Sequence, residues 1–130
     1  MFDWKKPTVQ MLGRWQPWHD GHTELFKRAL KKTGQVCIMY RDVEGVDAGV
    51  EGQADNPFGF EEVKKNIIVG LSKHNFEEGR DYVVIKVPNI INISYGRGVG
   101  YSFTEHDLGK EIHAISATNI RKELRLKKEL

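Results

Sequence analysis

The sequence has little cysteine and no long apolar run, and each absence excludes a class of protein. Its single cysteine, Cys37, cannot form an internal disulfide, so a disulfide-stapled secreted scaffold is excluded. No stretch of about 18 consecutive apolar residues is present to span a membrane. The first residues also lack an apolar segment of roughly 7–15 residues, which a signal peptide needs. We therefore expect a cytoplasmic protein that does not enter a membrane.

Charge of one sign is scarce as well. Twenty Lys and Arg residues face eighteen Asp and Glu residues, which leaves a net charge of +2. This excess is too small to indicate a general nucleic-acid or anionic-membrane binder, although a local cluster of cations can still bind one particular anion. The five histidines and Cys37 show no C-x-x-C or H-E-x-x-H spacing, so we expect no protein-bound metal site.

What is present is the composition of one soluble globular domain, with 39% apolar and 29% charged residues over 130 positions. Short β-branched or apolar runs at 8–12, 36–40 and 82–87 predict strands. Between them, residues 20–33 and 60–73 repeat apolar side chains every three to four positions, which predicts two helices. Strands alternating with helices favour right-handed crossovers and an open parallel sheet with helices on both faces.

The rest of the chain is less regular. Residues 41–58 form a long stretch rich in turn residues, and residues 89–102 fit no period. Residues 111–115 are compatible with a short strand and residues 116–128 with a helix. The expected fold is therefore a single α/β domain over residues 1–130, a Rossmann-like, doubly wound parallel sheet of about five strands.

Two histidines mark the first turn between a strand and a helix. His19 and His22 lie at the expected entrance of the first helix, with Gly21 between them. In open parallel sheets, ligands bind beyond the carboxyl ends of the strands, where a helix N-terminus attracts anions. Two imidazoles there can donate hydrogen bonds to phosphate oxygens. The alternative is an ordinary capped helix with two surface histidines.

A second group of polar residues begins the expected last helix. Ser116 and Thr118 supply hydroxyls, and Arg121 follows one turn later with a guanidinium that suits phosphate oxygens. By themselves these residues are better explained by helix capping.

Together the two segments resemble a known family. Residues 13–22, which read GRWQPWHDGH, resemble the HxGH signature of nucleotidyltransferases of the cytidylyltransferase-like superfamily, and residues 115–121, ISATNIR, resemble its ISxTxxR signature. The longer form of the first signature is most similar to archaeal-type nicotinamide mononucleotide adenylyltransferases. The length of the chain is closer to that of glycerol-3-phosphate cytidylyltransferases. Only residues 89–114 separate the third strand from the second signature, fewer than archaeal members usually have.

The resemblance implies transfer of a nucleoside monophosphate from a nucleoside triphosphate to a phosphorylated small-molecule acceptor, with release of pyrophosphate. His19, His22 and Arg121 would be the catalytic residues, because they would stabilise the transferring and departing phosphates. Mg²⁺ would be bound mainly through the triphosphate and water. AMP transfer is favoured over CMP transfer, and family members of this size are often dimers or larger. The substrate-binding candidates are Gly13, Arg14, Trp15, Gln16, Gly21, Arg41, Asp42, Arg97, Ser116 and Thr118.

Several of these candidates have simpler alternatives. Arg41 and Asp42 follow the second strand and could meet an acceptor phosphate and a metal-linked water, or form a surface ion pair. Arg97 lies in a glycine-rich stretch that could bring it to a phosphate. For Trp15 and Trp18, packing in the core is favoured over stacking on a base. Two other functions also remain open: cytidylyl transfer to a phosphorylated alcohol or sugar, and a catalytically silent nucleotide-binding module.

Overall fold

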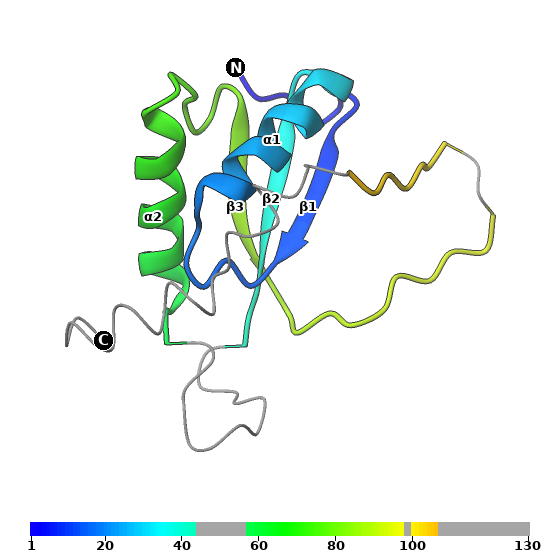
Figure 1. Cartoon of the computed structure of the whole chain (residues 1–130). Helices are drawn as coiled ribbons and strands as arrows, with labels where there is room; N and C mark the ends of the chain where they lie inside the picture. The colour runs from blue at the N-terminus through cyan, green and yellow to red at the C-terminus, as the bar shows by residue number, and fades with distance from the viewer. Residues whose placement is uncertain (44–56, 98–99, 107–130) are drawn as a thin grey trace.

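The fold is a parallel sheet with two helices packed on it (Figure 1). The computed structural model describes residues 1–43, 57–97 and 100–106. Three strands form one sheet in the order β1-β2-β3, and both neighbouring pairs are parallel. The α/β class and the parallel sheet predicted from the sequence are therefore confirmed. The elements are β1 (Val9–Gly13), α1 (Asp20–Thr33), β2 (Val36–Arg41), α2 (Phe60–Ser72) and β3 (Tyr82–Val87).

Strand register brings the loops that matter to one edge of the sheet. Gly13 at the end of β1 pairs with Tyr40 of β2, and Arg41 at the end of β2 pairs with Val87 of β3. The carboxyl ends of all three strands therefore lie side by side. The chain leaves this edge from β1 into the histidine-bearing loop, so that loop starts where parallel sheets bind ligands.

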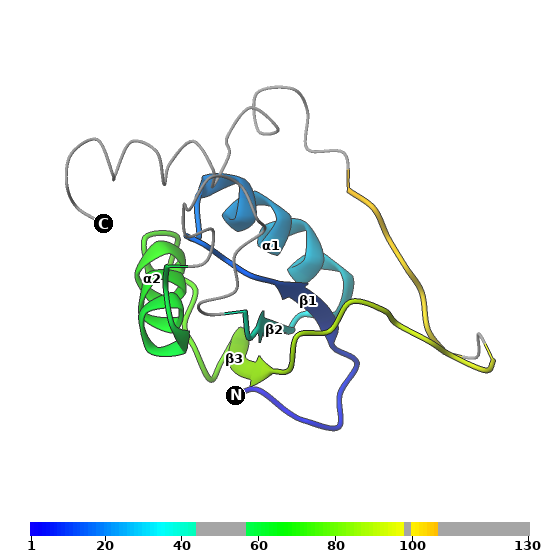
Figure 2. The same cartoon turned by 90° about the horizontal axis from the view of Figure 1, so that it is seen from below.

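Both helices lie on the same face of the sheet (Figure 2). The chain moves in one direction, from β1 to β2 to β3, and two crossovers of the same hand then place both helices on one side. Strands beyond these three, the strand at 111–115 and the helix at 116–128 lie outside the described residues. The five-stranded sheet with helices on both faces stays a prediction.

The core lies between the helices and this face of the sheet. Phe26 of α1, Ile38 of β2 and Val63 and Ile67 of α2 are completely buried. Tyr82 of β3 packs edge-on against Phe26, with ring centroids 5.6 Å apart. Cys37 is also buried, as expected for an inert core thiol, and burial raises the pKa of its thiol.

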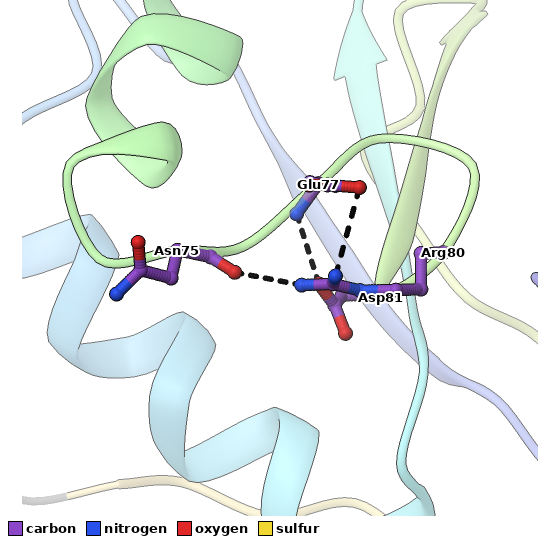
Figure 3. A network of polar contacts seen from close by, with 4 residues as sticks. All are labelled: Asn75, Glu77, Arg80 and Asp81. Atoms are coloured by element: carbon purple, nitrogen blue, oxygen red, sulfur yellow. Dashed lines mark hydrogen bonds and ion pairs between the residues drawn. The ribbon is translucent and has the colours of Figure 1, made fainter.

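At the amino ends of the strands, opposite the histidine loop, hydrogen bonds stabilise the turn that leads into β3. Figure 3 shows the turn from α2 to β3, where Arg80 donates to the carbonyl of Asn75 at 2.7 Å and to Asp81 at 3.0 Å. The backbone N–H of Glu77 donates to the same carboxylate at 2.9 Å. These contacts fix the entry into β3 at its amino end, remote from the histidines.

The remaining described chain adds neither a helix nor a strand. After β3, residues 88–97 run away from the sheet, and residues 100–106 turn back (Figure 1). Within the described residues, no helix is long and apolar enough to cross a membrane.

Candidate functional site

The site is built on the loop between β1 and α1, which begins at Gly13. Trp15 adopts a left-handed backbone conformation with φ of 52°, and its indole Nε1–H donates to the carbonyl of Met39 in β2 at 3.0 Å. A Cβ at Gly13 would lie 2.8 Å from the Trp15 ring, so only glycine allows the ring to fold back over the strand end. The loop is thereby attached to the central strand.

Two further side chains attach the loop to the helices. Trp18 Nε1–H donates to the Thr23 hydroxyl of α1 at 2.9 Å. The Gln16 side chain exchanges two hydrogen bonds with the backbone of Phe58, just before α2. Trp15 and Trp18 are only 6% and 8% exposed, which agrees with packing in the core. The substrate-binding role of Trp15 stays a prediction.

The two histidines form a stacked pair at the N-terminus of α1. Their ring centroids are 3.6 Å apart and their planes differ by 18°. His19 is the N-cap residue, and its Nδ1 accepts a hydrogen bond from the backbone N–H of Gly21 at 3.0 Å. His22 Nδ1 accepts from the backbone N–H of His19 at 3.1 Å. The two histidines thus form a capping box, in which His19 takes the place of the usual Ser or Thr and His22 that of the usual Glu or Gln.

This hydrogen bonding fixes the protonation state of both rings. A ring nitrogen that accepts a hydrogen bond carries no proton, so each imidazole holds its proton on Nε2. Within the described residues, no hydrogen bond uses either Nε2–H group. The pair therefore offers two donors from neutral rings, one from each histidine.

Burial favours the same neutral state. Burial, and to a smaller extent the neighbouring His19, lowers the pKa of His22 to about 3. Trp15 and Trp18 pack against the His22 ring, with centroids 4.8 and 5.3 Å from it. Burial also lowers the pKa of His19, and the nearby Asp20 carboxylate partly opposes this. Both histidines are therefore neutral donors at physiological pH.

Such an arrangement is suited to an anion. The N-terminus of α1 carries a partial positive charge, and the two Nε2–H groups add directed donors at the same place. Neutral imidazoles need no proton exchange to keep donating as charge develops on a bound oxygen. Gly21, the buried residue between them, contributes its backbone N–H to the cap.

The candidates after β2 are already engaged in contacts. Asp42 forms an ion pair with Lys86 of β3 at 3.5 Å, a partner that the sequence analysis did not name. Arg41 donates from Nη1 to the carbonyl of Ile90 at 3.4 Å, while its Nε is buried without a partner among the described residues. Their roles toward an acceptor phosphate or a metal-linked water stay predictions.

The remaining candidates lie in three different parts of the chain. Arg14 lies half-buried in the histidine loop itself, whereas Arg97 is exposed in the segment that runs away from the sheet. Within the described residues, no contact joins Arg97 to the histidine pair. Ser116, Thr118 and Arg121 lie outside the described residues, so their predicted approach to the histidines is not tested.

A groove of about 530 Å³ opens beside His19, and the sequence analysis missed it. The histidine loop forms one wall through Pro17 and Trp18, and α2 forms the other. Lys65, Val69 and Lys73 line it at intervals of four residues. The four-residue spacing of these side chains is visible in the sequence. Only the packing of α2 beside the histidine loop shows that they line a groove.

The described residues contain no group of three or more His, Cys, Asp or Glu side chains able to hold a metal ion together. The donor chemistry of the histidine pair suits phosphate oxygens, because protonated Nε2 atoms donate and do not ligate. Mg²⁺ bound through phosphate oxygens and water would be compatible with such a site.

Comparison with known proteins gives one informative match. No family model matches the chain. A protein of Methanococcus aeolicus, named nicotinamide-nucleotide adenylyltransferase, is 32% identical over 81 residues, which is 62% of this chain and 41% of the relative. This distant similarity supports a relationship to nucleotidyltransferases. The chain spans less than half the length of that relative, so similarity alone does not transfer the relative's substrates to it.

Proposed function

We propose that the protein is a nucleotidyltransferase that moves a nucleoside monophosphate from a nucleoside triphosphate to a phosphorylated small molecule. The observation that carries this proposal is the stacked, neutral histidine pair, whose two Nε2–H donors extend the anion-binding N-terminus of α1. A capped helix with two surface histidines explains the caps. It gives no reason for burying His22 between two tryptophans at the ligand-binding edge of the sheet.

The reaction is an in-line displacement at the α-phosphorus. An oxygen of the acceptor phosphate forms a bond to that phosphorus, and the bond to the oxygen bridging the α- and β-phosphates breaks. Pyrophosphate leaves with the electron pair of the broken bond. His19 and His22 donate to oxygens that become more negative in the transition state, so their hydrogen bonds strengthen there. No nucleophilic side chain is needed, because such transfer depends on positioning and on charge stabilisation.

Other residues complete the proposed site. Ser116, Thr118 and Arg121 would hold the departing β- and γ-phosphates, as the resemblance of residues 115–121 implies. Arg14, in the histidine loop, would contact the triphosphate or the acceptor. Mg²⁺, bound through phosphate oxygens, would neutralise part of the triphosphate charge.

For the substrates, we propose adenylyl transfer from ATP, with a nicotinamide nucleotide as the first acceptor to test. The first signature supports this choice, and so does the name of the Methanococcus aeolicus relative. Cytidylyl transfer to a phosphorylated alcohol is the alternative that the chain length suggested.

Pyrophosphate release tests the proposal directly. ATP, CTP, GTP and UTP, each with Mg²⁺, are paired with nicotinamide mononucleotide, glycerol 3-phosphate and other phosphorylated acceptors. We expect stoichiometric pyrophosphate and nucleotidylated product with at least one pair. Nucleotide binding without turnover for every pair would instead identify a silent nucleotide-binding module.

A further inference from the structure

Gln16 bridges two segments that are far apart in the sequence. Its Nε2 donates to the carbonyl of Phe58 at 2.8 Å, and its Oε1 accepts from the backbone N–H of Phe58 at 2.9 Å. The side chain is 2% exposed, and Phe58 is buried too. The Tyr40 hydroxyl at the end of β2 also donates to the Phe58 carbonyl, at 3.4 Å. One carboxamide therefore joins the histidine loop to the start of α2 near the end of the central strand.

We propose that Gln16 is a positioning residue, which sets the histidine pair through this bridge instead of contacting substrate. The inference rests on the proposed nucleotidyl transfer and deepens it. It also replaces the direct substrate-binding role that the sequence analysis gave to Gln16. Gln16 is committed to the protein backbone through both ends of its amide, and it lies three residues before the N-cap histidine.

The consequence for His19 follows from how the loop is held. Trp15 attaches the loop to β2, Trp18 attaches it to α1, and Gln16 alone among these three attaches it to the segment before α2. Phe58 also lines the groove, together with Pro17 and Trp18. Releasing the Gln16 bridge therefore lets the segment carrying His19 shift relative to α2, and displacements of about 1 Å can cost a hundredfold in turnover.

The chain contains a matched control for this bridge. Gln35 is 5% exposed, donates from Nε2 to the carbonyl of Asp3 at 2.6 Å and accepts from the Asp3 backbone N–H at 3.0 Å. Gln35 thus makes the same pair of hydrogen bonds to the backbone of one residue, and its Nε2 also donates to the Thr8 hydroxyl at 2.7 Å and the Lys6 carbonyl at 3.4 Å. It precedes β2 and therefore lies at the amino end of the sheet. Replacing Gln35 tests loss of such a bridge without disturbing the histidine loop.

A glutamate substitution makes the test reversible by pH. In Gln16→Glu the ionised carboxylate faces the Phe58 carbonyl and cannot donate to it. The protonated carboxyl has one O–H donor and an acceptor oxygen, which suffice for the two hydrogen bonds that the amide makes with Phe58. Burial and the facing carbonyl raise the pKa of the introduced carboxyl, so acidification restores the bridge. Gln16→Met, which has similar length and no titrating group, has no such rescue.

The kinetic experiment compares each variant with the wild type at every pH, using the nucleotide and acceptor pair that turns over. At about pH 8, we expect kcat of Gln16→Glu to fall by roughly 10- to 100-fold with KM for the nucleotide within about threefold. Relative to wild type, kcat should recover as the pH falls toward about 5.5. Gln16→Met should stay low throughout, and Gln35→Glu should keep kcat within about twofold. Equal loss of kcat in Gln16→Glu and Gln35→Glu would overturn the inference.

Imidazole nitrogen NMR separates this inference from the proposed function. In the wild type we expect both histidines to show an unprotonated Nδ1 and a protonated Nε2. Gln16→Glu at alkaline pH should change the His19 signals, and Gln35→Glu should leave them unaltered. Unaltered His19 signals in a folded Gln16→Glu protein would refute positioning, whether or not the enzyme turns over. If the His19 signals change in Gln16→Glu but the wild type releases no pyrophosphate, the positioning role of Gln16 is supported and the proposed nucleotidyl transfer is refuted.

Discussion

His19 and His22 combine two tasks that usually fall to different residues. Each imidazole accepts a backbone hydrogen bond through Nδ1 and thereby starts a helix, and each keeps an Nε2–H for a ligand. A serine or aspartate could cap the helix equally well but would offer no such second donor. The pair is therefore explained by capping and by ligand binding together.

Asparagine separates these two tasks at position 19. Asparagine is a good N-cap residue, and its side-chain oxygen can accept in place of Nδ1, but it has no group at the position of Nε2. We expect His19→Asn to keep a melting temperature near that of wild type and to lose on the order of a hundredfold in kcat. Initial rates of pyrophosphate release and thermal unfolding measure the two effects. A kcat within a few-fold of wild type would contradict the role assigned to His19.

The lowered pKa of His22 predicts a dependence of stability on pH. The folded protein keeps His22 neutral down to about pH 3, whereas the unfolded chain binds a proton near the ordinary value of 6.5. Stability from this group is therefore complete above about pH 6.5 and is lost on acidification, by up to ~1.4 kcal/mol per pH unit. Urea unfolding of the wild type and of His22→Asn between about pH 7 and 4 isolates the contribution. Parallel stability curves for the two proteins would contradict a buried, neutral His22.

At the scale of elements, the site depends on how one loop is attached to its neighbours. Trp15 donates to β2, Gln16 bonds to the segment before α2, and Trp18 donates to α1. Three side chains of one loop therefore connect it to three parts of the fold. Gly13 permits this, because its missing Cβ leaves room for the Trp15 ring.

Alanine at position 13 should therefore loosen the loop. A Cβ there would meet ring atoms of Trp15 at 2.8 to 2.9 Å, too close for either group to stay in place. We expect Gly13→Ala to lower the free energy of unfolding by about 1–3 kcal/mol. Gly96→Ala is the matched control, since nothing lies within 4 Å of its Cβ position, and should change stability by less than about 0.5 kcal/mol. Similar denaturation midpoints for Gly13→Ala and Gly96→Ala would show that the ring moves freely.

The elements themselves were predictable, because each has a simple local cause. Helix α1 begins at the histidine cap and ends at Gly34, whose φ of 90° suits glycine, and both signals are visible in the sequence. The apolar runs at Val36 and Tyr82 predicted buried strands, and both strands begin there. Local periodicity was therefore enough to predict where these helices and strands lie.

The contacts of the site were less predictable, because they join residues far apart in the chain. Nothing near Gln16 in sequence indicates that its amide meets Phe58, 42 positions later. Likewise, the sequence presented Asp42 as a candidate for a metal-linked water, and only the pairing of β2 with β3 brings Lys86 next to it. Residue type and spacing indicated a candidate site, and tertiary contacts show which polar groups hold its loop in place.

At the scale of the whole molecule, the site follows from a parallel sheet whose strand ends are in register. That register gathers the histidine loop, the end of β2 and the end of β3 at one edge. The turns formed by Gln35 and Arg80 brace the other edge. The proposed ligand site and the bracing contacts thus lie at opposite ends of the sheet, so we expect variants at the braced end to affect stability alone.

Nucleotide binding should therefore stabilise the protein as a whole. A triphosphate that binds only the folded state raises the stability by about 2.7 kcal/mol at a hundred times its Kd. Thermal-shift measurements with the Mg²⁺ complexes of ATP, CTP, GTP and UTP should show the largest rise for the nucleotide that is turned over. Equal shifts with all four nucleotides and with inorganic triphosphate would mean that the base is not recognised.

The central claim is that the Nε2–H groups of His19 and His22 both donate hydrogen bonds to one triphosphate. Imidazole NMR observes this contact directly. The ligand is the Mg²⁺ complex of the α,β-methylene analogue of the best nucleotide from the thermal-shift series, which binds but cannot be cleaved between the α- and β-phosphates. We predict that the Nε2 protons of His19 and His22 both move downfield and exchange more slowly with water as the analogue saturates the protein. Saturation with no change at either ring would contradict the account.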